Sequence, residues 1–159
     1  MAKSFYKTAS LIAASCRSAA VFSSADEALK ADMFAYGRHL GLAFQVVDDI
    51  LDFTQSTEQL GKPRGQDLAS GNLTAPVLFA LEDAEVGPSL LGLIESEFRE
   101  EGSLERGLQL VAAGRGLERA RALAREEGEL ARAALTKLGP GEVRKSLEGM
   151  VDFVLERIS

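Results

Sequence analysis

The chain has 159 residues and a formal net charge of −6, from 18 Lys and Arg against 24 Asp and Glu. This acidic balance argues against a nucleic-acid-binding protein, which would present a basic stripe, and no apolar run approaches the roughly 18 residues of a membrane span. Ala and Leu supply 23 residues each, whereas Val and Ile together supply 13, so the composition predicts an all-α fold.

Two helices are predicted in the first third of the chain. Apolar residues recur every three or four positions over residues 4–22, and they do so without a break over residues 25–53. Ser24 and Glu27 fit a capping box, in which two side chains satisfy the free backbone N–H groups of a helix start. We therefore expect the second helix to begin next to Ser24.

The rest of the chain is predicted to alternate helices with loops. Residues 54–72 lose the period and gather glycine and proline, which is typical of an irregular loop. Asn72 or Thr74 is suited to cap a helix that Gly87 and Pro88 would end at about residue 85. Further helical patterns lie at 89–99, 103–113, 117–138 and 142–158. We expect a bundle of six or seven helices with no sheet.

The helix predicted over 25–53 carries a second line of residues beside its apolar face. Its members are spaced four, four, three and four apart and therefore lie along the helix axis: Gly37, Gly41, Gln45, Asp48 and Asp52. Asp49 lies about a hundred degrees away at the same end of the helix. Carboxylates at a helix C-terminus oppose the macrodipole, and interior glycines weaken a helix. Such conflicts with local stability tend to mark function.

These carboxylates suggest a magnesium site. Crowded carboxylates repel one another unless a cation compensates, and Mg²⁺ takes hard oxygen ligands while bridging to substrate phosphates. Lys62 and Arg64 in the following loop, with Lys7 from the first helix, would supply cations for a diphosphate. The alternative is a solvated acidic helix end beside a basic surface loop, because a DDxxD string by itself is common.

Three stretches resemble, in their order and spacing, the C-terminal half of the trans-prenyl diphosphate synthases: SFYKTASLIAAS, GLAFQVVDDILDFT and LGKPRGQDLASGNLTAPVLFAL. The resemblance covers nearly all of residues 1–159 and is greatest to the solanesyl diphosphate synthases of plastids and cyanobacteria. It implies a single region with the all-α fold of the C-terminal half of the isoprenoid-synthase helical bundle.

The resemblance also implies roles for individual residues. The family's second aspartate-rich motif falls on Asp48, Asp49 and Asp52, which would bind Mg²⁺ with Asp48 as the direct ligand. Lys7 would hold the allylic diphosphate, and the oxygen of Thr8 would face the allylic cation.

Four more positions match the family's motifs. Phe44 and Gln45 match a pair that lines the reacting centre. Lys62 matches a lysine that reaches the same diphosphate, and Asp67 matches an aspartate that supports the lysine's loop. The implied reaction is the Mg²⁺-dependent elongation of an allylic diphosphate with isopentenyl diphosphate.

Several parts of the family's pattern are missing from the sequence. Only the second of two aspartate-rich motifs is present, and the basic cluster that binds isopentenyl diphosphate is absent. We therefore expect the chain to be half of an enzyme, with no substantial turnover alone. The resemblance further implies a homodimer, or a heterodimer with a prenyl synthase subunit, and a plastid location (otherwise a cytoplasmic one).

Two alternatives compete with the truncated synthase. One is a non-catalytic helical subunit that docks onto a complete prenyl diphosphate synthase and modulates it. The other keeps the metal site but is a terpene cyclase, which shares the ionisation step. The presence of Lys7, Gln45, Asp48 and Lys62 favours the synthase over the modulating subunit. The Lys-Thr pair and the Gly-Lys loop favour it over the cyclase.

Two chemically reactive residues are expected to be structural. His39, the single histidine, is predicted on the exposed side of the apolar stripe with a surface or helix-packing role, because no nucleophile pairs with it. Cys16 lies on the apolar stripe of the first helix and is predicted to be a small core residue.

Overall fold

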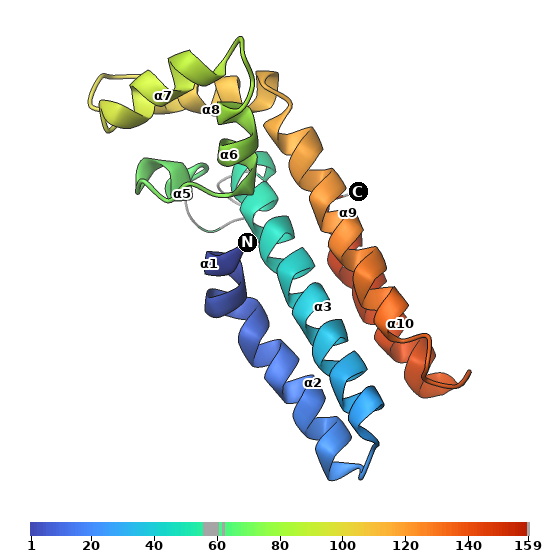
Figure 1. Cartoon of the computed structure of the whole chain (residues 1–159). Helices are drawn as coiled ribbons and strands as arrows, with labels where there is room; N and C mark the ends of the chain where they lie inside the picture. Colours follow the sequence, from blue (N-terminus) through green and yellow to red (C-terminus); the bar gives the residue numbers. More distant parts are fainter. Residues whose placement is uncertain (56–60, 62, 159) are drawn as a thin grey trace. The chain divides into compact units, whose positions relative to one another are not determined.

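The computed structural model describes residues 1–55, 61 and 63–158, and over this range it contains helices, turns and bends but no strand. The helical segments, shown in Figure 1, are α1 Ala2–Ser4, the π-helical turn η1 Phe5–Ala9, α2 Ser10–Phe22, α3 Glu27–Thr54, α5 Gln66–Ala69, α6 Ala75–Leu81, α7 Gly87–Glu95, α8 Ser103–Ala113, α9 Gly116–Ala134 and α10 Glu142–Glu156. The all-α prediction is confirmed. Seven of the described helices have seven residues or more, which agrees with the predicted six or seven.

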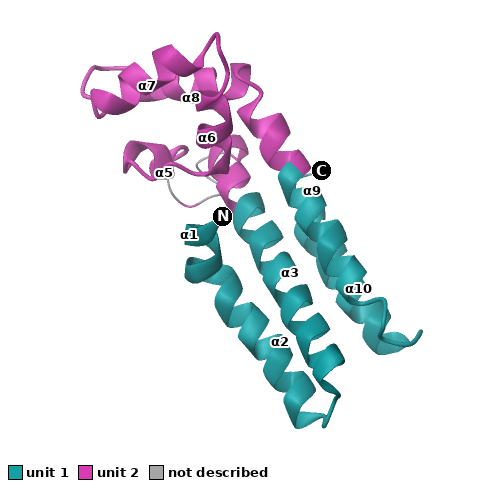
Figure 2. Ribbon diagram, in the orientation of Figure 1, with its two compact units in different colours: residues 1–47, 123–159 teal, residues 48–122 magenta. Residues whose placement is uncertain are grey.

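The chain divides into two compact units, coloured separately in Figure 2. Unit 1 comprises Met1–Val47 and Leu123–Ser159, and unit 2 comprises Asp48–Ala122. The helices α3 and α9 each run from one unit into the other along the chain. Each unit buries its own set of apolar side chains.

Two helix boundaries differ from the predictions. Ser24 does not cap α3, because it lies in a left-handed turn with φ 55°. Asp26 is the cap, since its Oδ1 accepts a hydrogen bond of 2.7 Å from the backbone N–H three residues on. Gly87 and Pro88 do not end the preceding helix. They begin α7, because the first turn of a helix has no use for the N–H that proline lacks.

In unit 1, the N-terminal helices pack closely against α3 through small residues. A Cβ built on Gly41 would lie 2.6 Å from the Cα of Ala9, and one built on Gly37 would lie 2.8 Å from the Cα of Ala13. Real Cβ atoms do not approach so closely, so the two glycines allow the backbones to touch. Cys16 is half-buried beside Gly37, consistent with its predicted place on the packed face.

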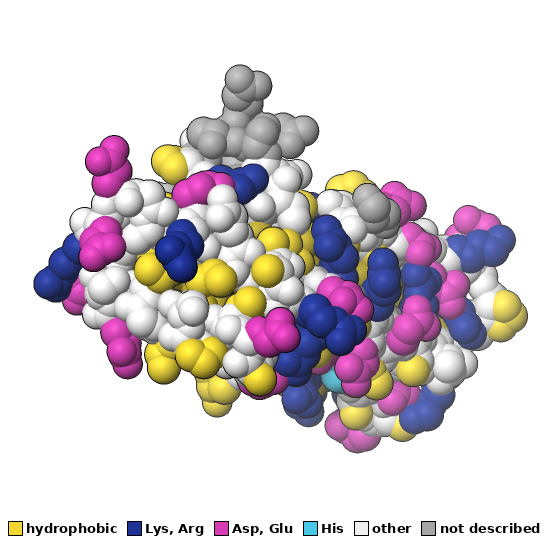
Figure 3. Space-filling model, turned by 90° about the horizontal axis from the view of Figure 1, so that it is seen from above, with side chains coloured by type: hydrophobic (Ala, Val, Ile, Leu, Met, Phe, Trp, Pro, Cys, Tyr) yellow, Lys and Arg dark blue, Asp and Glu magenta, His cyan; other side chains and the backbone are white. Residues whose placement is uncertain are grey.

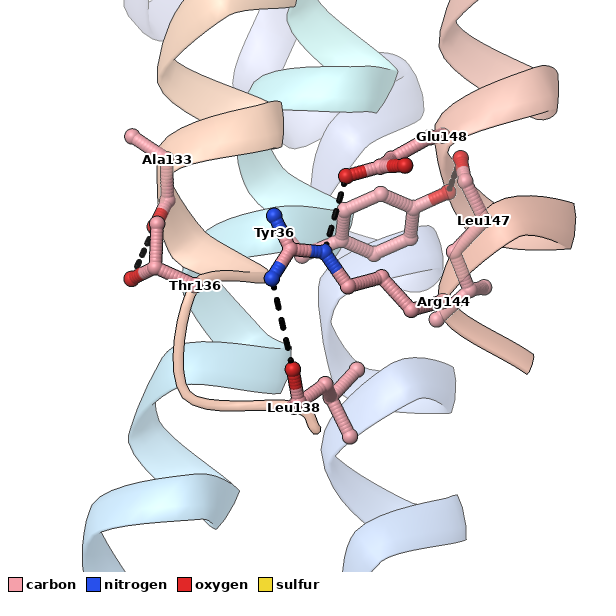
Figure 4. A network of polar contacts seen from close by, with 7 residues as sticks. All are labelled: Tyr36, Ala133, Thr136, Leu138, Arg144, Leu147 and Glu148. Atoms are coloured by element: carbon pink, nitrogen blue, oxygen red, sulfur yellow. Dashed lines mark hydrogen bonds and ion pairs between the residues drawn. The ribbon is translucent and has the colours of Figure 1, made fainter. Parts of the chain in front are cut away.

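Polar contacts join α3 to the C-terminal helices of the same unit. Tyr36 is only 1% exposed, and its hydroxyl donates a 2.9 Å hydrogen bond to the carbonyl oxygen of Leu147 on α10, beside the Arg144–Glu148 ion pair shown in Figure 4. His39 Nδ1 lies 2.7 Å from Glu127 Oε2 on α9. The predicted helix-packing role of His39 is therefore what the structure shows, although its side chain is mostly buried rather than exposed.

In unit 2, shorter helices enclose a core that begins at the last turns of α3. Its buried members are Phe53, Leu68, Val77, Ala80, Leu90, Leu108 and Val111. The loop predicted over 54–72 includes the four-residue helix α5, whose Leu68 belongs to this core. The C-terminal turns of α3 and the start of α5 are therefore held in one packed unit.

The surface gives no sign of a membrane-spanning or single-sign charged region. Within the described part of the chain, no helix combines the length and the apolar character needed to cross a bilayer. On the face shown in Figure 3, acidic and basic side chains are intermixed.

Candidate functional site

Unit 1 brings together two of the predicted site residues. The hydroxyl of Thr8 donates a 2.6 Å hydrogen bond to Oε1 of Gln45, although the two residues are 37 positions apart. Gln45 is 6% exposed, whereas Lys7 beside Thr8 is exposed. Lys7 and Thr8 both lie in the π-helical turn η1, a local departure from α-helix that is often found at functional sites. Periodicity in the sequence did not predict this turn.

Phe44, the other half of the predicted Phe-Gln pair, has a cationic neighbour. The guanidinium carbon of Arg157 lies 5.2 Å from the centroid of the Phe44 ring, a distance typical of a cation–π contact. Arg157 follows the last turn of α10, more than a hundred positions along the chain. No sequence signal pointed to this arginine, because the contact is made only by packing.

The three carboxylates of the DDxxD motif begin unit 2, and they lie in different environments. Asp48 is exposed, whereas Asp49 is 6% and Asp52 only 1% exposed. The Oδ2 atom of Asp52 accepts a 3.1 Å hydrogen bond from the backbone N–H of Asp67. The spacing predicted one acidic face, but burial distinguishes the exposed Asp48 from the two buried carboxylates.

Asp67 is held on its other side by Asn72. The Nδ2 group of Asn72 donates to Asp67 Oδ1 at 3.0 Å, and the Asn72 backbone N–H donates to the Asp67 carbonyl oxygen at 2.8 Å. The residue at the start of α6 is Thr74, which makes no side-chain cap hydrogen bond. Asn72 was predicted only as a helix cap, so its link to the predicted site residue Asp67 was missed.

The cations of the predicted diphosphate loop are only partly described. Lys62 lies outside the described residues. Arg64 is exposed, and its guanidinium lies 3.5 Å from a carboxylate oxygen of Glu105 on α8. Gly65 follows with φ 71°, and a Cβ built on it would lie 2.6 Å from Cδ2 of Leu108. The turn at residue 65 therefore requires glycine both for its backbone conformation and for space.

The donor set constrains how a divalent cation would bind. Among the described residues, no group of three or more His, Cys, Asp or Glu side chains is arranged to hold a metal ion. Mg²⁺ commonly takes only one or two protein carboxylates and completes its shell with water and substrate phosphate. The exposed Asp48 fits such a site, whereas a site enclosed by all three carboxylates does not fit.

Known proteins share this sequence and fold. The family model described as polyprenyl synthetase matches residues 1–111. The chain is 55% identical to the chloroplastic solanesyl-diphosphate synthase 2 of Oryza sativa subsp. japonica, over 98% of this chain and 38% of that protein. It is 53% identical to a prenyl transferase of Synechocystis, over 98% of this chain and 47% of that protein.

Solved structures give the same picture. A medium/long-chain length prenyl pyrophosphate synthase of Arabidopsis matches with a TM-score of 0.85 and 37% identity, over 98% of this chain and 53% of that one. A polyprenyl synthase from Caulobacter crescentus, complexed with calcium and isoprenyl diphosphate, matches with a TM-score of 0.85 and 34% identity, over 96% and 47%. The chain thus spans about half the length of these solved proteins and less than half of the curated relatives.

Proposed function

Since the chain belongs to the polyprenyl synthetase family, we propose that it provides the allylic-diphosphate side of a trans-prenyl diphosphate synthase of the solanesyl or polyprenyl type. The observation that carries the proposal is the hydrogen bond between Thr8 and Gln45. Both residues fall in motifs matched independently to this family, and packing joins their side chains. The substrates would be an allylic diphosphate and isopentenyl diphosphate.

In the proposed reaction, the C–O bond of the allylic diphosphate breaks and the diphosphate leaves with the electron pair. The double bond of isopentenyl diphosphate then attacks the allylic cation, and a proton is lost. Because Gln45 accepts the hydroxyl hydrogen of Thr8, the lone pairs of the Thr8 oxygen point away from Gln45. They are therefore available to face a developing positive charge.

The diphosphate would be bound by cations of the chain. We propose Lys7 and Lys62 for this role, with Asp67 supporting the loop that carries Lys62, and Phe44 lining the reacting centre beside Gln45. A bound Mg²⁺ would offset the charge of the leaving diphosphate. Asp48 is the residue we propose to hold it, as the exposed carboxylate of the motif.

A second candidate function is supported by the outer face of α2. Leu11 and Phe22 are 74% and 89% exposed. Between them, the hydroxyls of Ser15 and Ser18 donate to backbone carbonyl oxygens four residues back, both at 2.8 Å. These hydroxyls need no water, so the face suits burial against another helix. It would serve either the part of the synthase fold that this chain does not span or, for a docking subunit, a complete prenyl synthase.

Calorimetry with inorganic pyrophosphate tests the principal proposal. Pyrophosphate should bind the chain in a Mg²⁺-dependent manner, and Asp48→Asn should weaken binding by about tenfold or more because it removes the anionic ligand. Glu101→Gln, which removes an exposed charge elsewhere in the same unit, is the matched control. Pyrophosphate binding that is indifferent to both Mg²⁺ and Asp48→Asn would contradict the proposal.

A turnover assay separates the two candidate functions. With radiolabelled isopentenyl diphosphate, we expect no substantial elongation by this chain alone. If the chain is a docking subunit, adding it to a complete synthase should change that enzyme's rate or product, and the Asp48→Asn variant should have the same effect. We also propose a plastid location, in line with the chloroplastic relative from rice.

A further inference from the structure

We propose that Asp52 is a positioning residue, whose buried carboxylate fastens the start of α5 to the last turns of α3, and that it is not a metal ligand. The inference rests on the proposed function only in its second half, which concerns the metal. Its first half concerns contacts within unit 2 and stands independently.

Asp52 contacts the turn before α5 at two points. Its carboxylate accepts from the N–H of Asp67 at 3.1 Å, and its own carbonyl oxygen accepts from the N–H of Gly65 at 2.9 Å. A carboxylate that is 1% exposed is costly to bury unless hydrogen bonds satisfy it. The contact with Asp67 is therefore part of what allows Asp52 to be buried.

The contact also supplies what α5 lacks. A helix start leaves backbone N–H groups without an intrahelical partner, and the residue at the cap position usually accepts from one of them. Here the cap residue is Gly65, which has no side chain and makes no side-chain cap. Asp52 takes over this role from a different helix.

The same turn is fixed from the opposite side. Asn72 donates to both the side-chain and the backbone oxygen of Asp67, and Gly65 packs against Leu108. Asp67 is thus held between α3 and the segment that leads into α6. We infer that Asp48 and Asp52, one helical turn apart in a single motif, have different roles: Asp48 faces outward and Asp52 holds the turn that ends the predicted diphosphate loop.

Two variants of Asp52 test the anchor. In hydrogen–deuterium exchange of the full chain, Asp52→Ala should speed exchange at the Asp67 amide by about tenfold, as expected for the loss of a hydrogen bond to a charged acceptor. Asp52→Asn retains an acceptor oxygen at the same place and should stay within about threefold of the native chain. Unchanged exchange in Asp52→Ala would overturn the anchor.

Calorimetry with Mg²⁺ and inorganic pyrophosphate tests the absence of ligation. Asp52→Asn should retain the native affinity within about threefold, whereas Asp48→Asn should lose about tenfold or more. An equal loss in both variants, with normal exchange in Asp52→Asn, would make Asp52 a ligand and overturn the inference.

Two further outcomes keep the inference separable from the proposed function. If the native chain binds no pyrophosphate, the proposed function fails and the claim about ligation fails with it, while the exchange measurement still decides the anchor. If Asp52→Ala does not fold, Asn72→Ala releases Asp67 from the other side. It should raise exchange at the same amide, and no rise would count against the anchored turn.

Discussion

The close approach of the N-terminal helices to α3 depends on Gly41, and Gly41→Ala tests it. The added Cβ would lie 2.6 Å from the Cα and 2.8 Å from the Cβ of Ala9. Neither atom moves by a change of rotamer, so η1 and α2 must shift as a whole. Gly149 in α10 is the matched control, because it is exposed and a Cβ built on it meets nothing within 4 Å.

The two substitutions have opposite expected signs. Glycine to alanine inside a helix gains roughly 1 kcal/mol, and an extra methyl group in a packed site costs about 1–3 kcal/mol. With rigid atoms so close to Gly41, the upper end applies, and Gly41→Ala should destabilise the chain by about 2 kcal/mol. Gly149→Ala should stabilise it by up to about 1 kcal/mol. For a chain of this size, these changes correspond to a Tm about 4–8 °C lower and about 2–4 °C higher.

Urea unfolding followed by circular dichroism at 222 nm measures both changes, with equal m-values required for the comparison. The site supplies a second readout. A shift of η1 would lengthen the Thr8–Gln45 hydrogen bond, so the side-chain amide resonance of Gln45 should move in Gly41→Ala and stay in place in Gly149→Ala. Equal stabilisation by both substitutions would refute the close packing at Gly41.

Three further predictions concern other parts of the fold. Burial raises the pKa of Tyr36 to about 12; since the folded state holds this proton more tightly than the unfolded state, stability should fall as pH rises from about 10 to 12, and Tyr36→Phe should flatten that fall. Burial also raises the pKa of the Cys16 thiol, so its reaction with a disulfide reagent at pH 8 should be slower in the native chain than in urea; equal rates would contradict its burial. Gly65→Ala should destabilise unit 2 more than Gly71→Ala, because both have positive φ but only the first meets Leu108; equal urea midpoints would refute the contact.

Much of the helical architecture could be predicted because its causes are local. The helix predicted at 103–113 is α8 at the same residues, and the one predicted at 25–53 is α3 within two residues at each end. Periodicity failed where the cause was the conformation of a turn. Gly87 and Pro88 suit the end of one helix as well as the start of the next, and only the backbone around them distinguishes the two.

The sequence by itself determined the line of Gly41, Gln45 and Asp48, because one unbroken helix carries these residues and its periodicity sets their alignment. The tertiary structure decided what each residue contacts. It joined Thr8 to Gln45 and turned Asp52 from an expected ligand into a buried acceptor for Asp67. The physical reason is range: helical spacing follows from neighbouring residues, whereas burial and hydrogen-bond partners depend on segments that only folding brings together.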